Sequence, residues 1–373
     1  MLNLTQSCVL SECFASAEAE GGDRERGVFL RLRQVFQDMV NFRKSTSVPL
    51  RAMVAGIVFL CALVGLAAQQ APAPGAQTPS GPVDPKADEQ RLGLTGPANP
   101  KLPSLFLVGD STVRNGHGTG SDGLWGWGAP IADLFNPTKI NVVNRAIGGL
   151  SSHTYISAGH WDSTLEMVKP GDFVVIQFGH NDGGLNLPGA TPVPDQGLAP
   201  GATPPTPPPG AAPRGPNGRG SLPGIGEETM EVENPRTRVK ETVHTFGWYL
   251  RKYVADTRAK GATPILCSLV PRKIWVDGKI RRNTSTYRGW TQQVAAKEHV
   301  GFVDLNEIIA ERYDAMGEAA VDPLFGDPHT HTTMAGAQLN AECVVAGLKA
   351  LPRDPLAGYY SAKGKAIEPF AGG

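Results

Sequence analysis

The stretch "SLFLVGDST", residues 104–112, decides the fold because an apolar run ends there in a Gly-Asp-Ser turn. Short apolar runs bounded by turn residues are typical of buried β-strands. Four more follow along the chain, namely "KINVVNRA" (139–146), "DFVVIQFGHND" (172–182), "ATPILCSLVP" (262–271) and "VGFVDL" (300–305). The sequence therefore predicts about five short strands between residues 104 and 305.

Helix-like stretches separate these runs. Residues 236–260 carry an apolar residue at every third or fourth position and end at Lys260-Gly261, a basic last turn followed by glycine. Residues 333–350 predict a final helix. Strands alternating with amphipathic helices indicate right-handed βαβ units. We therefore expect an α/β fold, a three-layer α/β/α sandwich with a mostly parallel sheet of about five strands.

Polar clusters follow three of the predicted strands directly. They are Gly109-Asp110-Ser111, Gly148-Gly149 and the run from Gly179 to Asp182. In a parallel sheet the ligand site lies beyond the carboxyl ends of the strands. The three clusters should therefore meet on one rim of the sheet.

The residue types on that rim suit acyl transfer. This chemistry needs a hydroxyl nucleophile, a base, a partner that orients the base, and donors for the oxyanion. Ser111 offers the hydroxyl, Gly149 an accessible backbone N–H, and Asn181 a side-chain amide. A base is available in "GDPHTHTTMAG" (326–336), which contains two histidines.

The three polar clusters and the histidine-containing stretch resemble the conserved blocks of the SGNH (GDSL-type) hydrolase superfamily. They resemble most of all those of the rhamnogalacturonan acetylesterase family of carbohydrate esterases. The likeness spans about residues 103–350, the insertion described below excepted, and implies a flavodoxin-like sheet. It places Ser111 as nucleophile, His331 as base, and Ser111, Gly149 and Asn181 as the oxyanion hole. The matching blocks are "LFLVGDSTV" (105–113), "NRAIGGLSS" (144–152), "IQFGHNDGG" (176–184) and "HTHTTMAGA" (329–337).

The orienting aspartate departs from the family pattern. The family places it three residues before the catalytic histidine, where this chain has Pro328. Asp327 lies four residues before His331. Either a small bulge brings Asp327 to the ring of His331, or a water, a backbone carbonyl or another carboxylate holds it. His329 follows Asp327 by two residues and could form a competing pair.

The resemblance implies deacetylation of plant cell-wall pectin through an acetyl-enzyme on Ser111. We expect Trp275 to offer a platform for a sugar ring, and Arg272 and His153 to meet the carboxylates of an anionic polymer. Two alternatives remain open. One is the same chemistry on another ester, such as acetylated xylan, a lipid or an aryl ester. The other is a non-catalytic glycan-binding module.

The flanks of the domain differ in composition from its core. Residues 1–68 hold an N-terminal extension and a basic-flanked apolar run (52–68) that indicates a signal peptide, or alternatively a membrane anchor. Residues 69–100 are rich in Pro, Ala and Gly and predict a linker. We expect the hydrolase domain at 101–352, with a Pro/Gly-rich insertion at about 183–226, and a C-terminal tail at 353–373.

The charge balance and the cysteine content limit which partners and cofactors we expect this protein to bind. The 373 residues carry 35 basic and 35 acidic side chains, which argues against nucleic acid as a partner. No Cys-x-x-Cys spacing exists, which argues against a metal site, and the sequence indicates no organic cofactor either. Cys267 and Cys343 lie in apolar runs and predict buried thiols. We expect a secreted or periplasmic monomer that acts on an acetylated polysaccharide and contacts no membrane beyond its signal or anchor.

Overall fold

The computed structural model describes residues 84–114, 119–187, 219–234 and 238–372. The predicted signal or anchor, the first part of the predicted linker (69–83) and most of the predicted insertion (188–218) lie outside the described residues. Within the described ranges, no helix has both the length and the apolar character that a membrane span requires.

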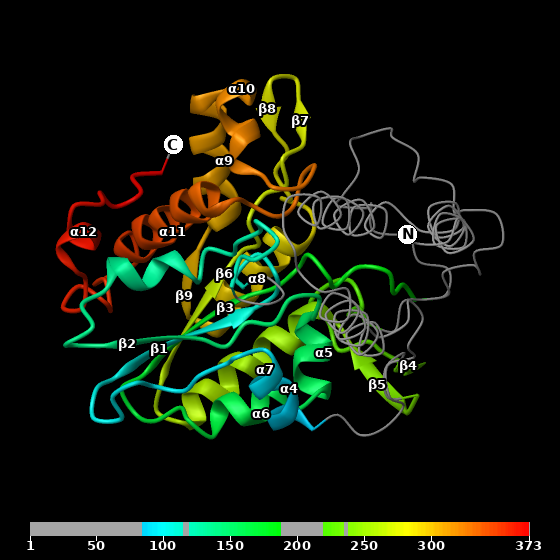
Figure 1. Ribbon diagram of the computed structural model, residues 1–373. Coiled ribbons are helices and arrows are strands. Elements are labelled where there is room, and N and C mark those ends of the chain that lie inside the picture. The colour runs from blue at the N-terminus through cyan, green and yellow to red at the C-terminus, as the bar shows by residue number, and fades with distance from the viewer. Residues whose placement is uncertain (1–83, 115–118, 188–218, 235–237, 373) are drawn as a thin grey trace, which may run out of the picture. The chain divides into compact units, whose positions relative to one another are not determined.

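The described residues form one five-stranded sheet, and all its strands are parallel. The strand order is β2-β1-β3-β6-β9 (Figure 1). This is the flavodoxin-like order, in which ligands bind where the order reverses beside the first strand. Each predicted run supplies one strand: β1 (Ser104–Gly109), β2 (Asn141–Asn144), β3 (Phe173–Gln177), β6 (Thr263–Cys267) and β9 (Gly301–Val303).

Helices cover both faces of this sheet. In chain order, the helices and 3₁₀ turns of the described residues are α4 (Pro85–Arg91), η1 (Pro130–Leu134), α5 (Ser152–Ser157), α6 (His160–Leu165), α7 (Phe246–Ala259), α8 (Tyr287–Glu298), α9 (Leu305–Met316), α10 (Glu318–Val321), η2 (Asp322–Leu324), α11 (Met334–Lys349) and α12 (Ala362–Lys365). Figure 1 shows α9 and α11 on one side of the sheet and α5, α6 and α7 on the other. The predicted three-layer α/β/α sandwich is confirmed.

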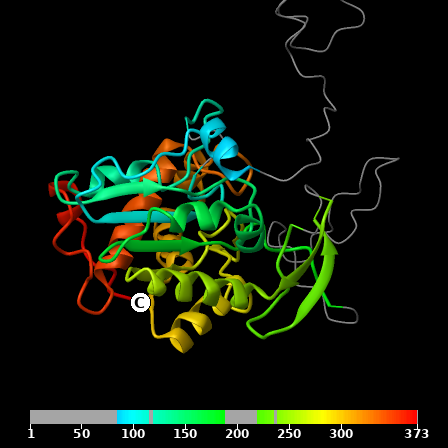
Figure 2. The same cartoon turned by 90° about the horizontal axis from the view of Figure 1, so that it is seen from below.

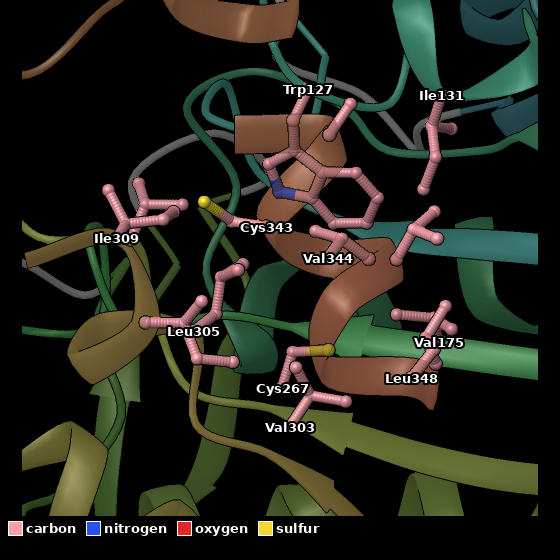
Figure 3. Close-up of a cluster of buried hydrophobic side chains, with 14 of the residues drawn as sticks. Trp127, Ile131, Val175, Cys267, Val303, Leu305, Ile309, Cys343, Val344 and Leu348 are labelled. Carbon is pink, nitrogen blue, oxygen red and sulfur yellow. The ribbon is translucent and has the colours of Figure 1, made fainter. Parts of the chain in front are cut away.

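Alternate residues of β1 enter two apolar layers. Leu105 of β1 belongs to the cluster under α9 and α11, whereas Phe106 belongs to the cluster under α7 and α8. Figure 3 shows the first cluster, where Cys267 of β6 and Cys343 of α11 lie among aliphatic side chains. Both thiols are free and buried. Burial raises the pKa of each, that of Cys343 to about 12, so these thiols are unreactive.

The predicted helix 236–260 is shorter than expected. Residues 240–244 form a strand, β5 (Lys240–His244), which pairs antiparallel with β4 (Thr229–Glu233), and the helix α7 begins at Phe246. Thr245 caps α7 by accepting a hydrogen bond from the Trp248 N–H. Val239, one of the apolar residues whose spacing predicted this helix, is 61% exposed. Figure 2 shows this hairpin projecting away from the sheet.

The folded domain is larger than the predicted range 101–352. Residues 84–100 of the predicted linker form α4 and a packed strap, in which Leu92 and Leu94 lie against the second apolar cluster. The predicted C-terminal tail also packs. Its Tyr360 is buried, and the Phe370 N–H donates to the Ala346 carbonyl at 3.0 Å. Both ends of the described chain thus belong to the domain.

A second antiparallel ribbon, β7 (Trp275–Val276) and β8 (Lys279–Ile280), follows β6.

Candidate active site

Ser111 lies on a tight turn just beyond the carboxyl end of β1. Gly109 ends the strand, and a Cβ atom there would come within 2.5 Å of the Gln177 carbonyl oxygen, so the position requires glycine. Asp110 closes the turn, because its Oδ1 accepts hydrogen bonds from the N–H and the hydroxyl of Thr112 at 2.9 and 2.7 Å. The turn therefore fixes the direction in which the Ser111 side chain points.

The base faces this hydroxyl from a distant part of the chain. Nε2 of His331 lies 2.8 Å from Oγ of Ser111. His331 stands on the loop between η2 and α11, and its neighbour Thr332 pins that loop. The Trp125 N–H donates to the Thr332 carbonyl, and the Thr332 hydroxyl donates to the Trp125 carbonyl, both at 2.8 Å. The imidazole is thus placed to take the proton of the serine hydroxyl.

Asp327 orients the imidazole from the other side. Its Oδ2 lies 2.5 Å from Nδ1 of His331. Its Oδ1 accepts three backbone N–H groups, those of His329, Thr330 and His331, at 3.0, 2.6 and 3.0 Å. Burial alone would raise the pKa of Asp327, but the backbone N–H groups of Thr330 and His331 and the His331 ring outweigh burial and lower it. The carboxylate therefore stays ionised.

The extra residue at Pro328 is accommodated by this loop. Of the two arrangements that the sequence left open, the structure has the one in which Asp327 itself contacts His331. The ring of His329 points elsewhere, because its Nδ1 contacts the Thr330 hydroxyl at 2.7 Å and lies 3.5 Å from a guanidinium nitrogen of Arg272.

The two further oxyanion candidates lie on the loops after β2 and β3, the two strands that flank β1. Gly149 has φ +79°, and a Cβ atom there would meet nothing within 4 Å, so its backbone borders open space. One N–H of the Asn181 amide donates to the Leu150 carbonyl at 3.0 Å. This bond joins the two loops, and the amide carries a second N–H donor. Both loops follow strands that pair with β1, at whose carboxyl end Ser111 lies.

The sequence assigned no role to three ionisable groups in the predicted clusters, namely Asp110, His180 and Asp182. Burial raises the pKa of Asp110, whose Oδ2 is buried without a hydrogen-bond donor among the described residues. Burial raises the pKa of Asp182 to about 6. The pKa of His180 lies well below its usual value because the ring is buried and the positive charge of Arg272 lies near it. Their adjacency to Ser111 and Asn181 was the available signal.

The predicted substrate-binding residues lie in different surroundings. A guanidinium N–H of Arg272 donates to the Thr330 hydroxyl, so Arg272 touches the catalytic loop. Trp275 is half-buried and packs partly against the first apolar cluster. His153 does not lie on the surface, because it is 3% exposed and its Nε2 contacts Glu241 at 3.0 Å. Its predicted contact with substrate is therefore corrected to an internal one.

No group of three or more His, Cys, Asp or Glu side chains is arranged to hold a metal ion in the described part of the chain. The side chains of the site supply a nucleophile, a base with an ionised partner, and an amide donor.

Known proteins resemble this chain in sequence. The model of the GDSL-like lipase/acylhydrolase family matches residues 107–339. A rhamnogalacturonan acetylesterase of Emericella nidulans is 29% identical over 239 residues, 64% of this chain and 82% of that protein. YesY of Bacillus subtilis, a probable rhamnogalacturonan acetylesterase, is 29% identical over 252 residues, 66% of this chain and 93% of that protein. Among solved structures, Bacillus subtilis YxiM matches with a TM-score of 0.49 and 21% identity, over 69% of this chain and 58% of that one.

The matched range runs from within β1 to within α11, so it includes the nucleophile turn, both oxyanion loops and the histidine loop. Sequence match and site geometry therefore concern the same residues. The chain belongs to the GDSL-like lipase/acylhydrolase family, whose members are ester hydrolases.

Proposed function

We propose that this protein is a serine esterase that removes acetyl groups from a plant cell-wall polysaccharide, namely rhamnogalacturonan. One observation carries the proposal. The Ser111 hydroxyl, the His331 ring and the Asp327 carboxylate form a continuous hydrogen-bonded relay, with contacts of 2.8 Å and 2.5 Å. Such a relay is what activates a serine hydroxyl for attack on an ester.

Acylation is the first half of the reaction. His331 takes the Ser111 proton as Oγ attacks the acetyl carbonyl carbon, and the carbonyl electron pair moves onto oxygen. The N–H groups of Ser111 and Gly149 and the Asn181 amide stabilise that oxyanion. The tetrahedral intermediate then collapses, and the bond between the acetyl carbon and the sugar oxygen breaks. His331 gives its proton to that oxygen, which leaves as a sugar hydroxyl.

Deacylation repeats these steps with water. His331 takes a proton from water, and the hydroxide attacks the acetyl-enzyme. Acetate leaves, and the proton goes back to Ser111. Asp327 stays ionised throughout, holds the Nδ1 proton of His331 and stabilises the imidazolium. Its lowered pKa suits this role.

The choice of polymer is supported by charge and by similarity. Pectic polymers are anionic, and Arg272 places a guanidinium against the catalytic loop at Thr330. Arginine suits carboxylate recognition because its planar fork can donate two parallel hydrogen bonds. The two relatives that are 29% identical carry the name rhamnogalacturonan acetylesterase, one of them as probable.

Acetate release from defined polymers tests the proposal. The purified chain should release acetate from acetylated rhamnogalacturonan faster than from acetylated xylan, and it should cleave long-chain p-nitrophenyl esters slowly. Ser111→Ala serves as the blank. Faster release from xylan, or preference for long acyl chains, would replace the proposed substrate with that ester. Lack of Ser111 labelling by a fluorophosphonate, together with retained polysaccharide binding, would instead indicate a glycan-binding module.

Arg272 offers a sharper test of the anionic polymer. Arg272→Gln should raise KM for rhamnogalacturonan several-fold and leave p-nitrophenyl acetate hydrolysis near the wild-type rate. Lys273→Gln is the matched control, because the Lys273 ammonium is already bound to Asp322 at 2.6 Å. Equal KM changes in the two variants would remove Arg272 from substrate recognition.

The proposal includes export from the cytoplasm, supported by the basic-flanked apolar run at 52–68. Cell fractionation of a strain expressing the full chain should place the enzyme in the medium or the periplasm, with an N-terminus after residue 68. Recovery of the uncleaved chain in the membrane fraction would favour an anchor instead.

A further inference from the structure

Asp182 occupies an unusual position next to the oxyanion asparagine. It is fully buried, and its Oδ1 accepts hydrogen bonds from the Ser152 N–H at 3.1 Å, the Ser152 hydroxyl at 2.5 Å and the Ser221 hydroxyl at 3.0 Å. A buried carboxylate is costly unless donors satisfy it. Two of these donors belong to Ser152 and the third to Ser221, so the carboxylate joins two distant segments of the chain to the loop that carries Asn181.

Ser152 connects Asp182 to the loop of the second oxyanion donor. It is the first residue of α5 and stands three residues after Gly149. The Asn181 amide reaches the same loop directly, through its 3.0 Å bond to the Leu150 carbonyl. The loops that carry Gly149 and Asn181 are therefore held together by two neighbouring side chains, Asn181 and Asp182.

The described end of the predicted insertion contacts both of these loops. We call residues 219–221 the return segment. Its Ser221 N–H donates to the Asp182 carbonyl at 3.0 Å. On the other loop, the Ser151 hydroxyl donates to the Arg219 carbonyl, and Nδ1 of His153 donates to the Gly220 carbonyl at 3.0 Å. The return segment thus contacts both loops at once.

Gly220 shows how closely the return segment is packed. A Cβ atom at this position would come within 2.6 Å of the Gly183 carbonyl oxygen and 2.7 Å of the Asp182 carbonyl oxygen. Both obstacles are backbone atoms, which cannot swing aside as a side chain can. The backbone of the return segment therefore lies directly against the loop that carries Asn181.

We propose that Asp182 and Ser221 are positioning residues, which clamp the return segment against the two oxyanion loops and so set the geometry of the Gly149 and Asn181 donors. Neither side chain touches the reacting atoms. Their effect on the reaction runs through the position of the donors, and a misplacement of about 1 Å in a catalytic group can cost about 10²-fold in rate. The inference rests on the proposed acyl-transfer mechanism but not on the identity of the polysaccharide.

The test compares Ser221→Ala with Ser268→Ala on p-nitrophenyl acetate, a substrate without sugar. The two serines are matched. Each is fully buried, and each hydroxyl donates to an aspartate Oδ1 at 3.0 Å, but the partner of Ser268 is Asp304, the N-cap of α9, and not Asp182. Ser221→Ala should lower kcat about tenfold at nearly constant KM, with an unchanged shape of the pH–kcat profile. Ser268→Ala should alter the melting temperature by a similar amount and leave kcat within twofold.

A double variant separates positioning from general loosening of the fold. If Ser221 acts through the oxyanion donors, Ser221→Ala should cost little more once Asn181→Ala is present. Fully additive losses, or equal kcat in Ser221→Ala and Ser268→Ala, would overturn the inference. Should Ser221→Ala not fold, Ser152→Ala removes another donor to Asp182 and carries the same expectations. A folded wild type that releases no p-nitrophenolate would overturn the esterase mechanism itself, an outcome distinct from these.

Discussion

Asp327 and His331 are four residues apart, yet Oδ2 of the first lies 2.5 Å from Nδ1 of the second. The loop manages this because Oδ1 of the same carboxylate collects the backbone N–H groups of residues 329, 330 and 331. One oxygen thus shapes the loop while the other orients the base. The carboxylate is both a structural and a catalytic group, which sets what its replacement should do.

Asp327→Asn should lower kcat by about 10³- to 10⁴-fold, because an amide stabilises the wrong tautomer and cannot stabilise the imidazolium. Its oxygen can still accept the backbone N–H groups, so the variant should fold. His329→Ala is the control, since it keeps the backbone N–H that reaches Asp327. The hydrolysis of p-nitrophenyl acetate checks both. If His331→Ala retained most of the rate while His329→Ala abolished it, the base would be misassigned.

Asn181→Ala should remain folded but lose about 10²- to 10³-fold in kcat, since removal of one oxyanion donor costs roughly 3–4 kcal/mol. The variant also loses the bond to the Leu150 carbonyl, so its loops should loosen slightly. Circular dichroism and kinetics on the same sample separate the two effects. Wild-type turnover would exclude the amide from the mechanism.

Gly149→Ala isolates the second oxyanion loop. At φ +79° an alanine costs about 1–2 kcal/mol, and the loop is expected to move to relieve that strain. Gly171 is a matched control, because it has φ +86° and equally open surroundings. It precedes β3 and so lies at the amino end of the parallel strands, whereas Gly149 lies beyond a carboxyl end. Both variants should melt a few degrees lower, whereas only Gly149→Ala should lose at least tenfold in kcat. A similar kcat in the two variants would contradict a role for Gly149.

The sheet was predictable because each of its strands is a short apolar run that ends in turn residues. The β4–β5 hairpin was not, because Val239 and Val243 stand at helical spacing from Phe246, and periodicity alone extended the helix too far. Thr245, the N-cap of α7, was the local signal that the helix begins later. The Asp182 contacts were invisible, since they join residues 30 and 39 positions apart.

The helix α4 was missed for a related reason. Its surroundings are rich in Pro, Ala and Gly, and it is held by a charge pair rather than by an apolar stripe. The Glu89 Oε2 lies 2.6 Å from a guanidinium nitrogen of Arg145, whose side chain is 3% exposed. No rule of local composition predicts that partner, which follows β2 more than fifty residues later.

This buried pair makes a prediction about stability. Glu89→Gln should leave the Arg145 charge buried and poorly compensated, at a cost of about 3 kcal/mol in the free energy of unfolding. Lys86→Ala is the control on the same helix. Its ion pair with Glu166 spans 3.9 Å between side chains that are about 70% exposed, and such pairs contribute less than about 1 kcal/mol. Urea unfolding of both variants checks this, and equal midpoints would show that α4 does not stabilise the domain.

Asp182 adds a pH dependence to stability. Its pKa is raised by burial to about 6, from 3.8 in an unperturbed carboxyl. Between about pH 4 and pH 6 the unfolded chain has therefore lost a proton that the folded protein keeps, so this group makes the protein less stable as the pH rises. Below that window the carboxyl is protonated in both the folded and the unfolded state, so it contributes nothing to the pH dependence of stability.

Asp182→Asn replaces the titratable carboxyl by an amide, so it should remove the loss of stability that the titration of Asp182 causes. The melting temperature of the wild type, relative to that of the variant, should fall between pH 4.5 and pH 7. The comparison with the variant cancels the titration of all other groups that the substitution leaves unperturbed. The melting temperature of the wild type could instead rise with pH relative to that of Asp182→Asn. That result would mean that the hydrogen bonds from Ser152 and Ser221 outweigh burial, and that Asp182 is ionised even in mild acid.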